Sequence, residues 1–232
     1  MIKLQNLSKR EGKKIIFEDI NFEIKKGEVV GILGKNSSGK TMLLDMIIGL
    51  KRPNSGNILL EDKDIFEDIF DTRRKIGYMS ETPIYKDMLV KEYLKFLIKI
   101  RNEDEQNLII NDQIEAFSLQ TIESELVGSL SRSENKKLAI AGAYVGGSKI
   151  VLLDEPFIGL DIDDVASIVD LIKSSKKKIT TIIATHSDEH LEEICDRVII
   201  INKAKIVADI KIDDLKKDKK SLKSYFIEVT KE

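Results

Sequence analysis

The stretch GKNSSGKT, residues 34–41, decides which fold this sequence predicts. It follows an apolar run at residues 29–33 and precedes an apolar stretch that begins at Met42, so it lies where a buried strand should turn into a helix. Gly34 and Gly39 carry no Cβ, which allows the backbone to turn successive N–H groups toward an anion at the positive end of that helix. The segment therefore predicts a loop that binds phosphate.

This loop supplies most of the candidate nucleotide ligands. Lys40 is placed to reach the β- and γ-phosphates, which also makes it a candidate catalytic residue, and the Thr41 hydroxyl is placed to bind Mg²⁺. A coincidental glycine-lysine loop is the alternative, and the strand and helix flanks argue against it. The candidate nucleotide-binding residues of the segment are Gly34, Lys35, Asn36, Ser37, Ser38, Gly39, Lys40, Thr41 and Met42.

Composition indicates a globular, enzyme-sized unit with no nucleic-acid partner. The 232 residues are 42% hydrophobic, which is enough for a substantial core. The 38 Lys and Arg residues against 40 Asp and Glu residues give a net charge of -2 with the signs interspersed, whereas nucleic-acid binding requires a basic patch. The densest lysine run, residues 216–220, is interpreted as a solvated helix face.

A single cysteine, Cys195, excludes an internal disulfide and fits a reducing compartment. Its apolar surroundings predict a small core residue. Residues 1–10 lack the apolar core of a signal peptide, and no stretch approaches the roughly 18 apolar residues that would span a bilayer. We expect a soluble chain.

Continuous apolar runs predict strands that are buried on both faces, as in a parallel sheet. They lie at residues 29–33, 150–153, 181–184 and 198–201. Helical spacing separates most of them, which indicates an α/β fold with a mainly parallel sheet. The expected helices span residues 41–48, 163–174 and 188–194.

Two further segments have the character of strands. Ile20, Phe22 and Ile24 alternate with polar residues, which is typical of a strand with one buried face, so we expect antiparallel strands to open the fold. The segment from Tyr225 to Val229 is also strand-like.

Between Leu89 and Tyr144, apolar residues recur at helical spacing without an obvious strand, which indicates an inserted helical subdomain. The spacing is found at residues 93–100, 108–117 and 138–144. We predict one domain over residues 1–232. Within it, residues 1–87 and 147–232 form a nucleotide-binding core with an antiparallel β subdomain, and residues 88–146 form the helical subdomain.

Two carboxylates follow the apolar run at residues 150–153, where ligands gather in parallel α/β sheets. Asp154 is placed to hold Mg²⁺ through its water shell, and Glu155 to orient the attacking water and accept its proton. Such pairs also cap helices or solvate turns, but the upstream phosphate loop favours a functional role.

His186 ends the apolar run at residues 179–185, again at the carboxyl end of a predicted strand. A histidine there can hydrogen-bond the γ-phosphate and hold the attacking water in line. A lone histidine is usually structural, but three strand ends converge here, which favours the site role. The other histidine, His190, lies on the following helix and has no such argument.

These motifs, in this order, resemble the ATP-binding subunit of ATP-binding-cassette (ABC) transporters over essentially the whole chain. GKNSSGKT resembles the family's Walker A motif, and residues 150–156, IVLLDEP, resemble Walker B with its catalytic glutamate. Residues 159–161 resemble the D-loop, and Thr185-His186 resembles the switch histidine. The resemblance implies a P-loop NTPase core with an antiparallel β subdomain and an inserted helical subdomain.

The same resemblance implies cofactors and partners. Two such domains close head to tail on two ATP molecules with Mg²⁺, and they drive a transmembrane permease. We therefore expect a second ATP-binding subunit, in a homodimer or heterodimer, and a location on the cytoplasmic, inner face of the cell membrane. Single short cassettes are typical of prokaryotic multi-chain systems, often exporters.

The family's signature, usually LSGGQ, is altered here to LSRSE at residues 130–134. In the family this segment closes over the ATP of the opposite subunit, and Ser131 can still do so. Ser133 adds a side chain where backbone approaches phosphate, and Glu134 adds a carboxylate beside an anion, so both should weaken closure. Arg132 partly offsets that charge.

Two other positions depart from the family pattern. Glu81 stands where the family usually has a glutamine that contacts Mg²⁺, and glutamate keeps an oxygen ligand for the ion. The alternative interpretation of Glu81 is an exposed acidic residue in a loop. Glu11 stands where an aromatic usually stacks on adenine. Phe17 is near in sequence, but its apolar neighbours favour a core position over an adenine platform.

Three hypotheses follow. The leading one is an ATPase subunit of a membrane transporter in which Lys40, Thr41 and Asp154 bind Mg-ATP, Glu155 is the general base and His186 holds the γ-phosphate. The alternative is a regulatory or switch subunit with weak or no ATPase activity because of the altered signature. A soluble ATPase of translation or DNA repair is the third, and the lack of a second phosphate loop argues against it.

Overall fold

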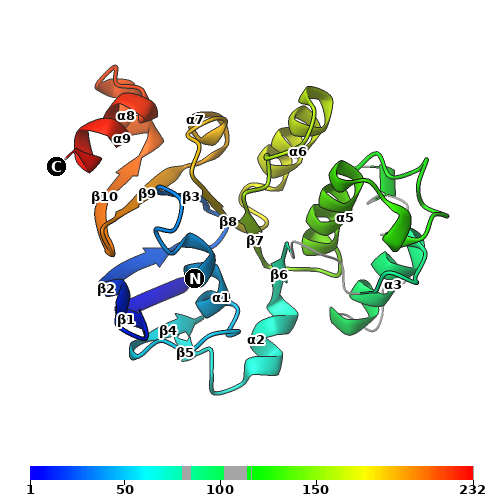
Figure 1. The fold of residues 1–232 in the computed structure, drawn as a ribbon, viewed down its shortest axis with the longest axis horizontal. Coiled ribbons are helices and arrows are strands. Elements are labelled where there is room, and N and C mark those ends of the chain that lie inside the picture. Colours follow the sequence, from blue (N-terminus) through cyan, green and yellow to red (C-terminus); the bar gives the residue numbers. More distant parts are fainter. Residues whose placement is uncertain (80–84, 102–113, 116, 232) are drawn as a thin grey trace.

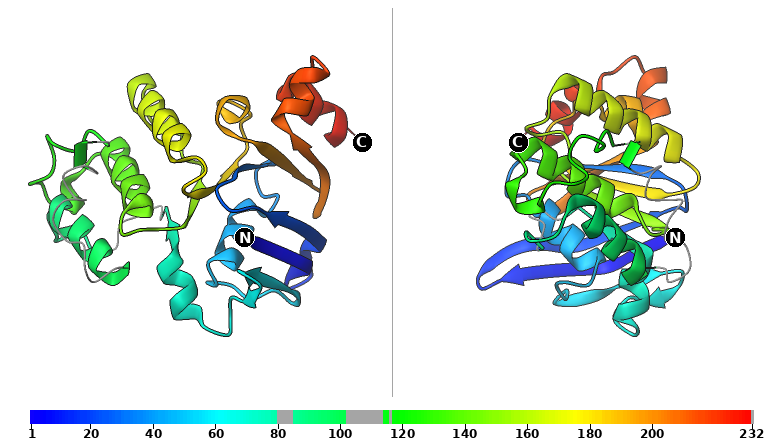
Figure 2. Two further views of the ribbon diagram at one scale, coloured as in Figure 1. Left: turned by 180° about the vertical axis from the view of Figure 1, so that it is seen from behind. Right: turned by 90° about the vertical axis from the view of Figure 1, so that its right-hand side faces the viewer.

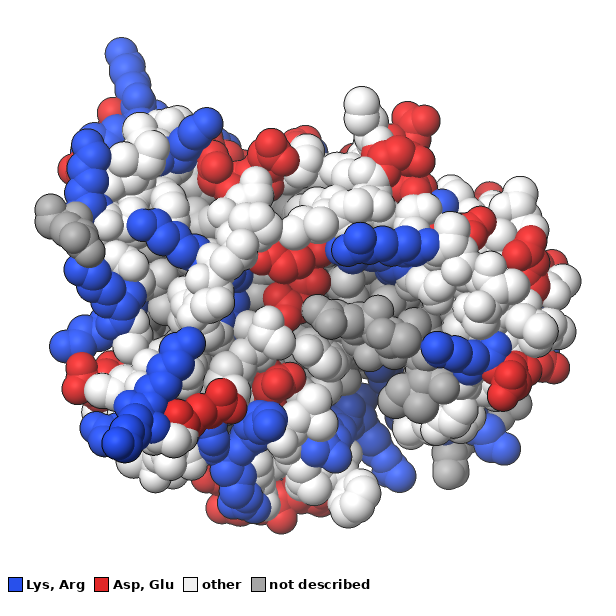
Figure 3. Space-filling model, viewed as in Figure 1, with Lys and Arg blue, Asp and Glu red and all other residues white. Residues whose placement is uncertain are grey.

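The computed structural model describes residues 1–79, 85–101, 114–115 and 117–231. Two β-sheets form its centre, and helices pack around them (Figures 1 and 2). None of the helices in this part of the chain combines the length and the apolar character that a bilayer span requires. On the face shown in Figure 3, basic and acidic side chains are interspersed, as the sequence predicts.

The larger sheet has six strands, of which five run parallel to one another and β10 pairs antiparallel at one edge. In spatial order the strands are β10 (Lys205–Lys211), β9 (Arg197–Asn202), β3 (Val29–Leu33), β8 (Thr180–Thr185), β7 (Ile150–Asp154) and β6 (Ile76–Tyr78). Every residue of β3, β7 and β8 is buried, because both faces of a parallel sheet are covered. The predicted mainly parallel sheet is confirmed.

Alternate side chains of β3 enter two separate cores, since successive residues of a strand point to opposite faces. Val30 and Ile32 join the core shared with helix α1 (Lys40–Ile47) and the smaller sheet, whereas Val29 and Leu33 join the core on the other face. Fully burying one such side chain contributes about 1.5–3 kcal/mol. Cys195 lies buried in the second core, where burial raises the pKa of its thiol, which confirms an apolar core residue.

The smaller sheet is antiparallel and begins the chain. Its strands, in spatial order, are β2 (Lys14–Ile24), β1 (Ile2–Glu11), β4 (Ser55–Leu60) and β5 (Lys63–Asp64). Ile20, Phe22 and Ile24 of β2 are buried while the residues between them are exposed, so the predicted strand with one buried face is confirmed. Its buried side chains pack against α1 and thereby support the loop that precedes this helix.

The helices between the strands at residues 76–78 and 150–154 lie together, away from the smaller sheet (Figures 1 and 2). They are α3 (Val90–Arg101), the short 3₁₀ helix η1 (Val127–Ser129) and α5 (Arg132–Tyr144), with α2 (Ile69–Lys75) preceding them. Arg101 joins α3 to the end of α5, because its Nη1 donates to the carbonyls of Gly142 at 2.7 Å and Val145 at 2.8 Å. Most of the predicted helical run at residues 108–117 lies outside the described residues.

The remaining helices correct two expectations. They are α6 (Ile162–Ser175), α7 (Leu191–Ile194), α8 (Ile212–Lys217) and α9 (Leu222–Thr230). The predicted strand at Tyr225–Val229 is wrong, because Leu222, Tyr225, Phe226 and Val229 recur at helical spacing and pack on the core as one face of α9. Helix α7 begins at Leu191 and not at residue 188, since His190 has a left-handed φ of 64° that cannot continue a helix.

Candidate active site

Three strand ends bring the candidate residues to one edge of the larger sheet. Strands β3, β8 and β7 are parallel neighbours (Figure 1). The loop after β3, His186 after β8 and Glu155 after β7 therefore emerge at the same edge. Ligands of parallel α/β proteins bind in the crevice at this edge. The structure therefore gathers five of the predicted residues, and the contacts below join them: Lys40, Thr41, Asp154, Glu155 and His186.

Close packing requires both glycines of the loop. Gly39 directly precedes α1 with a left-handed φ of 99°, and a Cβ there would lie 2.7 Å from Cζ of Phe17. A Cβ on Gly34 would lie 2.6 Å from Oγ of Ser38. Neither position tolerates a side chain, so the loop keeps a bare backbone whose N–H groups can face phosphate oxygens.

Ser38 adds a donor that suits a phosphate. Its hydroxyl is buried and has no hydrogen-bond partner among the described residues. An unsatisfied buried polar group costs about 1–3 kcal/mol, and a phosphate oxygen in the loop would satisfy it. The loop residues thus fit the nucleotide that their sequence predicts.

Lys40, the first residue of α1, turns back over the loop. Its Nζ donates to the carbonyls of Gly34 at 2.9 Å and Lys35 at 3.2 Å and lies 3.7 Å from Oε1 of Glu155. Burial lowers the pKa of Lys40, and the nearby carboxylates of Glu155 and Asp154 oppose that effect. The ammonium is therefore held at the mouth of the loop by oxygen atoms that a phosphate can replace.

Two of the three predicted metal ligands meet directly. The hydroxyl of Thr41 donates to Oδ2 of Asp154 at 2.5 Å, and Asp154 is buried at the end of β7. Hydroxyl and carboxylate oxygens are the donors that Mg²⁺ prefers, so the pair fits this ion. Glu81, the third predicted ligand, lies outside the described residues.

Glu155 is held by neighbours on both carboxylate oxygens. Oε2 accepts from the Thr185 hydroxyl at 2.8 Å, and Oε1 lies 2.9 Å from Nδ1 of His186. The backbone N–H of His186 also approaches Oε2 at 3.4 Å. The carboxylate therefore points to the strand end beside it, at the edge where the phosphate loop lies.

The sequence did not predict one contact with Glu155, which comes from outside the three strand ends. Lys136 of α5 donates to the carbonyl oxygen of Glu155 at 2.7 Å. This lysine follows the altered signature by two residues, and its contact spans 19 positions of the chain, which no local pattern encodes. Thr185, to which the sequence assigned no role of its own beside His186, also donates its hydroxyl to the Glu155 carboxylate.

The altered signature satisfies its own hydrogen bonds. Ser131 is the N-cap of α5, and it forms a capping box with Glu134 in which each residue binds the backbone N–H of the other. The Ser131 hydroxyl also donates to Oε2 of Glu134 at 2.6 Å. These bonds lower the pKa of Glu134. Ser131 lies at the start of α5 (Figure 1), and within the described residues it does not contact the phosphate loop.

A cavity of about 460 Å³ adjoins the phosphate loop on the side of the smaller sheet. Residues 35–38 of the loop face Ile15 and Ile16 of β2 across it, and the turn at residues 202–204 closes it. Phe17 does not line it, because this side chain is fully buried against Gly39, as expected of a core residue. The walls next to the loop are aliphatic and polar.

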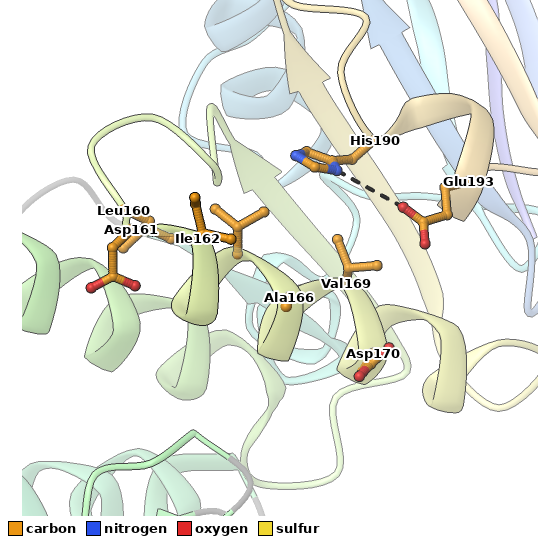
Figure 4. Close-up of a pocket in the computed structure, with 9 residues that line it drawn as sticks. Leu160, Asp161, Ile162, Ala166, Val169, Asp170, His190 and Glu193 are labelled. Atoms are coloured by element: carbon orange, nitrogen blue, oxygen red, sulfur yellow. Dashed lines mark ion pairs between the residues drawn. The ribbon is translucent and has the colours of Figure 1, made fainter.

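His190 lies apart from the strand edge, and it precedes α7 instead of lying on this helix as the sequence predicts. It lines an apolar pocket of about 310 Å³ beside α6, together with Ile162 and Val169 (Figure 4). Its Nδ1 lies 3.9 Å from a carboxylate oxygen of Glu193, and its ring lies 5.2 Å from that of Phe157. The single histidine at the strand edge is therefore His186.

Comparison with known proteins adds to this geometry. Residues 17–158 match the family model described as ABC transporter. The chain is 33% identical over 220 residues to the bacitracin transport ATP-binding protein BcrA of Bacillus licheniformis, covering 94% of this chain and 72% of BcrA.

Solved structures show the same fold. One described as an ATP binding subunit of an ABC transporter superposes with a TM-score of 0.92 at 25% identity, over 100% of both chains. A dimeric ATP-binding cassette in a post-hydrolysis state, bound to ADP and Pi, superposes with a TM-score of 0.84 at 22% identity. That match covers 91% of this chain and 99% of the cassette.

Proposed function

The chain belongs to the family of ABC-transporter ATP-binding subunits, and from that premise we propose how its residues divide the work of ATP hydrolysis. As a member of this family it binds and hydrolyses ATP and powers a membrane transporter. The observation that carries the division of roles is the meeting of Lys40, Glu155 and His186 at one sheet edge.

Residues 34–42 hold the phosphates of ATP in this proposal. The bare backbone at Gly34 and Gly39 and the N-terminus of α1 support it, because both present N–H groups to an anion. Lys40 exchanges the carbonyls of Gly34 and Lys35 for β- and γ-phosphate oxygens. The nucleoside lies in the cavity between the loop and Ile16.

Thr41 and Asp154 hold Mg²⁺, and Glu81 is a further proposed ligand. The 2.5 Å contact between the Thr41 hydroxyl and Asp154 supports the first two. When bound, the ion neutralises charge on the phosphates. Asp154 and Thr41 themselves are fixed by the end of β7 and the start of α1, so they keep their oxygens at the same edge.

Glu155 acts as the general base, and His186 holds the γ-phosphate and the attacking water in line. The carboxylate needs a neighbour that orients it, and the contacts with Thr185 and His186 supply that. His186 can bind Glu155 through Nδ1 while its other ring nitrogen faces substrate. Proton transfer then runs from water to the carboxylate.

The test of this function is Glu155→Gln, which keeps the shape of the side chain but removes the base. We expect ATP affinity within about twofold of the wild type and turnover lower by roughly 10²–10⁴-fold. Steady-state ATP hydrolysis and equilibrium dialysis of ATP measure the two quantities. Unchanged turnover would remove Glu155 from the mechanism.

A second ATP-binding subunit completes the site in this proposal. Ser131 lies at the N-terminus of α5, a position suited to an anion, and in the proposed dimer it faces the ATP of the opposite subunit. In the proposed dimer the two subunits close on the nucleotide. This closure uses the division of the chain into a core, residues 1–87 and 147–232, and a helical subdomain, residues 88–146.

The other proposed partner is a transmembrane permease, which places the chain on the inner face of the membrane. A groove of about 550 Å³ supports it, lined by Leu50, Phe70, Ile100 and two arginines, Arg73 and Arg74. Phe70 is 77% exposed. An amphipathic helix with apolar and acidic residues from the cytoplasmic side of the permease suits this surface. Phe70→Asp should abolish co-purification with the permease while leaving ATP binding unchanged.

The alternative proposal is a switch subunit that hydrolyses ATP slowly. It is favoured by one observation, the capping box in which Glu134 binds the Ser131 hydroxyl that the signature would offer to phosphate. Turnover in the presence of the permease supports the motor. Turnover absent in every pairing supports the switch.

A further inference from the structure

Lys136 of α5 is bound to the turn that carries the proposed general base. Its Nζ donates to the carbonyl oxygen of Glu155 at 2.7 Å and to that of Ile158 at 2.6 Å. Both carbonyls belong to the short turn between β7 and α6. Hydrogen bonds from an ammonium to carbonyl oxygens are charge-assisted and stronger than neutral ones, so one side chain fixes two points of this turn.

The main chain of Glu155 is in a conformation that needs such support. Its φ is 47°, in the left-handed region that side chains other than glycine rarely adopt. Strain of this kind persists where the surrounding structure holds it, and it gathers at functional sites. The N–H of Glu155 donates to the carbonyl of Ala184 in β8 at 2.8 Å, so β8 holds one side of the residue and Lys136 the other.

The orientation of the carboxylate follows from this backbone. With φ fixed, the side chain of Glu155 reaches Thr185 and His186, whose contacts occupy both of its oxygens. A relaxed φ would rotate Cβ and swing the carboxylate away from these two residues. The lysine therefore acts on the base through the main-chain carbonyl of Glu155.

The next residue, Lys137, provides a natural comparison. It forms an ion pair with Asp164 of α6 at 3.0 Å, and the two side chains are 17% and 14% exposed. Lys137 thus joins the same helix, α5, to the element after the turn. It shares charge, length and helix with Lys136, but none of its contacts among the described residues is with Glu155.

We propose that Lys136 is a positioning residue of the ATPase reaction, which holds the main chain of Glu155 in its left-handed conformation and thereby aims the carboxylate. The inference rests on the proposed role of Glu155 as general base. Misplacement of a reacting group by about 1 Å can lower the rate roughly a hundredfold. A shift of the Glu155 carboxylate should therefore lower kcat.

The variants Lys136→Met, Lys136→Arg and Lys137→Met test the proposal in the full chain paired with its permease. Lys136→Met should lower kcat roughly 10- to 100-fold and leave the KM for ATP within about twofold, because the phosphate loop is untouched. Lys136→Arg keeps a cation with several donors and should restore most of kcat. Lys137→Met should leave kcat within about threefold even if it unfolds at a lower temperature.

A double-mutant cycle separates positioning from a structural role. In the Glu155→Gln background Lys136→Met should lower the residual turnover no further, because the group it positions is gone. A wild-type kcat in Lys136→Met would overturn the proposal, and so would an equal loss in Lys137→Met. If Lys136→Met does not fold, Lys136→Gln carries the same test with a neutral donor.

Failure of the underlying function gives a different result. If Glu155→Gln alone keeps wild-type turnover, the role of the general base is wrong and Lys136 has nothing to position. If Glu155→Gln is inactive and Lys136→Met is not, only the role of Lys136 is wrong.

Discussion

The phosphate loop and the altered signature differ in where their polar groups find partners. Among the residues that the structure describes, none is a hydrogen-bond partner of the Ser38 hydroxyl, and the loop holds Lys40 on carbonyl oxygens that a phosphate can replace. The signature segment instead satisfies itself, with Ser131 and Glu134 paired in a capping box at the start of α5. The polar groups of the loop are available to a ligand. Those of the signature would first have to give up their hydrogen bonds to each other.

Because of this difference, a single subunit presents only part of the proposed ATP site. Binding groups, proposed metal ligands and the proposed base converge within one chain at a single sheet edge. In the proposed dimer, the signature contributes only when a second subunit brings Ser131 to the nucleotide. Variants in the loop should therefore abolish ATP binding, whereas variants in the signature should alter turnover and leave ATP binding unchanged.

The largest effect is expected from Lys40→Ala in the loop. Removing the ammonium takes away the charge that the phosphates require, so turnover should fall roughly a hundredfold or more together with ATP affinity. Equilibrium dialysis and a phosphate-release assay measure both. Lys51→Ala, which removes an exposed lysine beyond α1, is the matched control, and an equal loss there would contradict a specific role for Lys40.

Ser131→Ala tests the other region. It removes the cap of α5, at a cost of about 1 kcal/mol in unfolding free energy, and it removes the hydroxyl proposed for the opposite ATP. Turnover should fall roughly tenfold, the factor that corresponds to losing one hydrogen bond to a charged group. ATP affinity of the isolated subunit should stay unchanged, and weaker binding there would mean that Ser131 serves its own loop.

A smaller effect, of opposite sign, is expected when the signature regains its glycines. Arg132→Gly combined with Ser133→Gly removes side chains where backbone approaches phosphate, so turnover should rise a few-fold, the range of a coupling near 1 kcal/mol. Initial rates at saturating ATP measure it. No increase would count against the altered signature as the limiting defect.

The smallest effect concerns the acid stability of the cap. Hydrogen bonds from Ser131 lower the pKa of Glu134, so the ionised carboxylate stabilises the folded state at neutral pH, and this contribution is lost as pH falls through the lowered pKa. The window lies below about pH 4.3, the ordinary pKa of glutamate. Glu134→Gln should reduce the decline of unfolding free energy in that window, and denaturant titrations at several pH values measure it.

Much of this architecture could be predicted from local sequence. Continuous Val, Ile and Leu runs predict β3, β7 and β8 because both faces of a parallel sheet are buried, and parallel strands end at the same edge, which gathers Glu155 and His186. Helix α9 was missed because its aromatic and β-branched residues favour a strand, although Leu222, Tyr225 and Val229 recur with the helical period.

The contacts that local sequence did not predict are long-range ones. Lys136 reaches the carbonyls of Glu155 and Ile158 only because α5 packs beside the turn after β7. The left-handed φ of Glu155 is likewise imposed by tertiary hydrogen bonds, since glutamate has no intrinsic preference for it. Such features depend on how elements pack and not on any pattern within them.

The most direct test of the account is the mass of Glu155→Gln in solution with Mg-ATP, measured by light scattering. A subunit that binds ATP but does not hydrolyse it should double in mass, with one nucleotide retained per chain. Adding Ser131→Arg, which places a bulky side chain at the start of α5, should return it to a monomer that still binds ATP. A Glu155→Gln subunit that stays monomeric with ATP bound, or a dimer that survives Ser131→Arg, would contradict the claim that the loop binds alone and the signature covers from the opposite subunit.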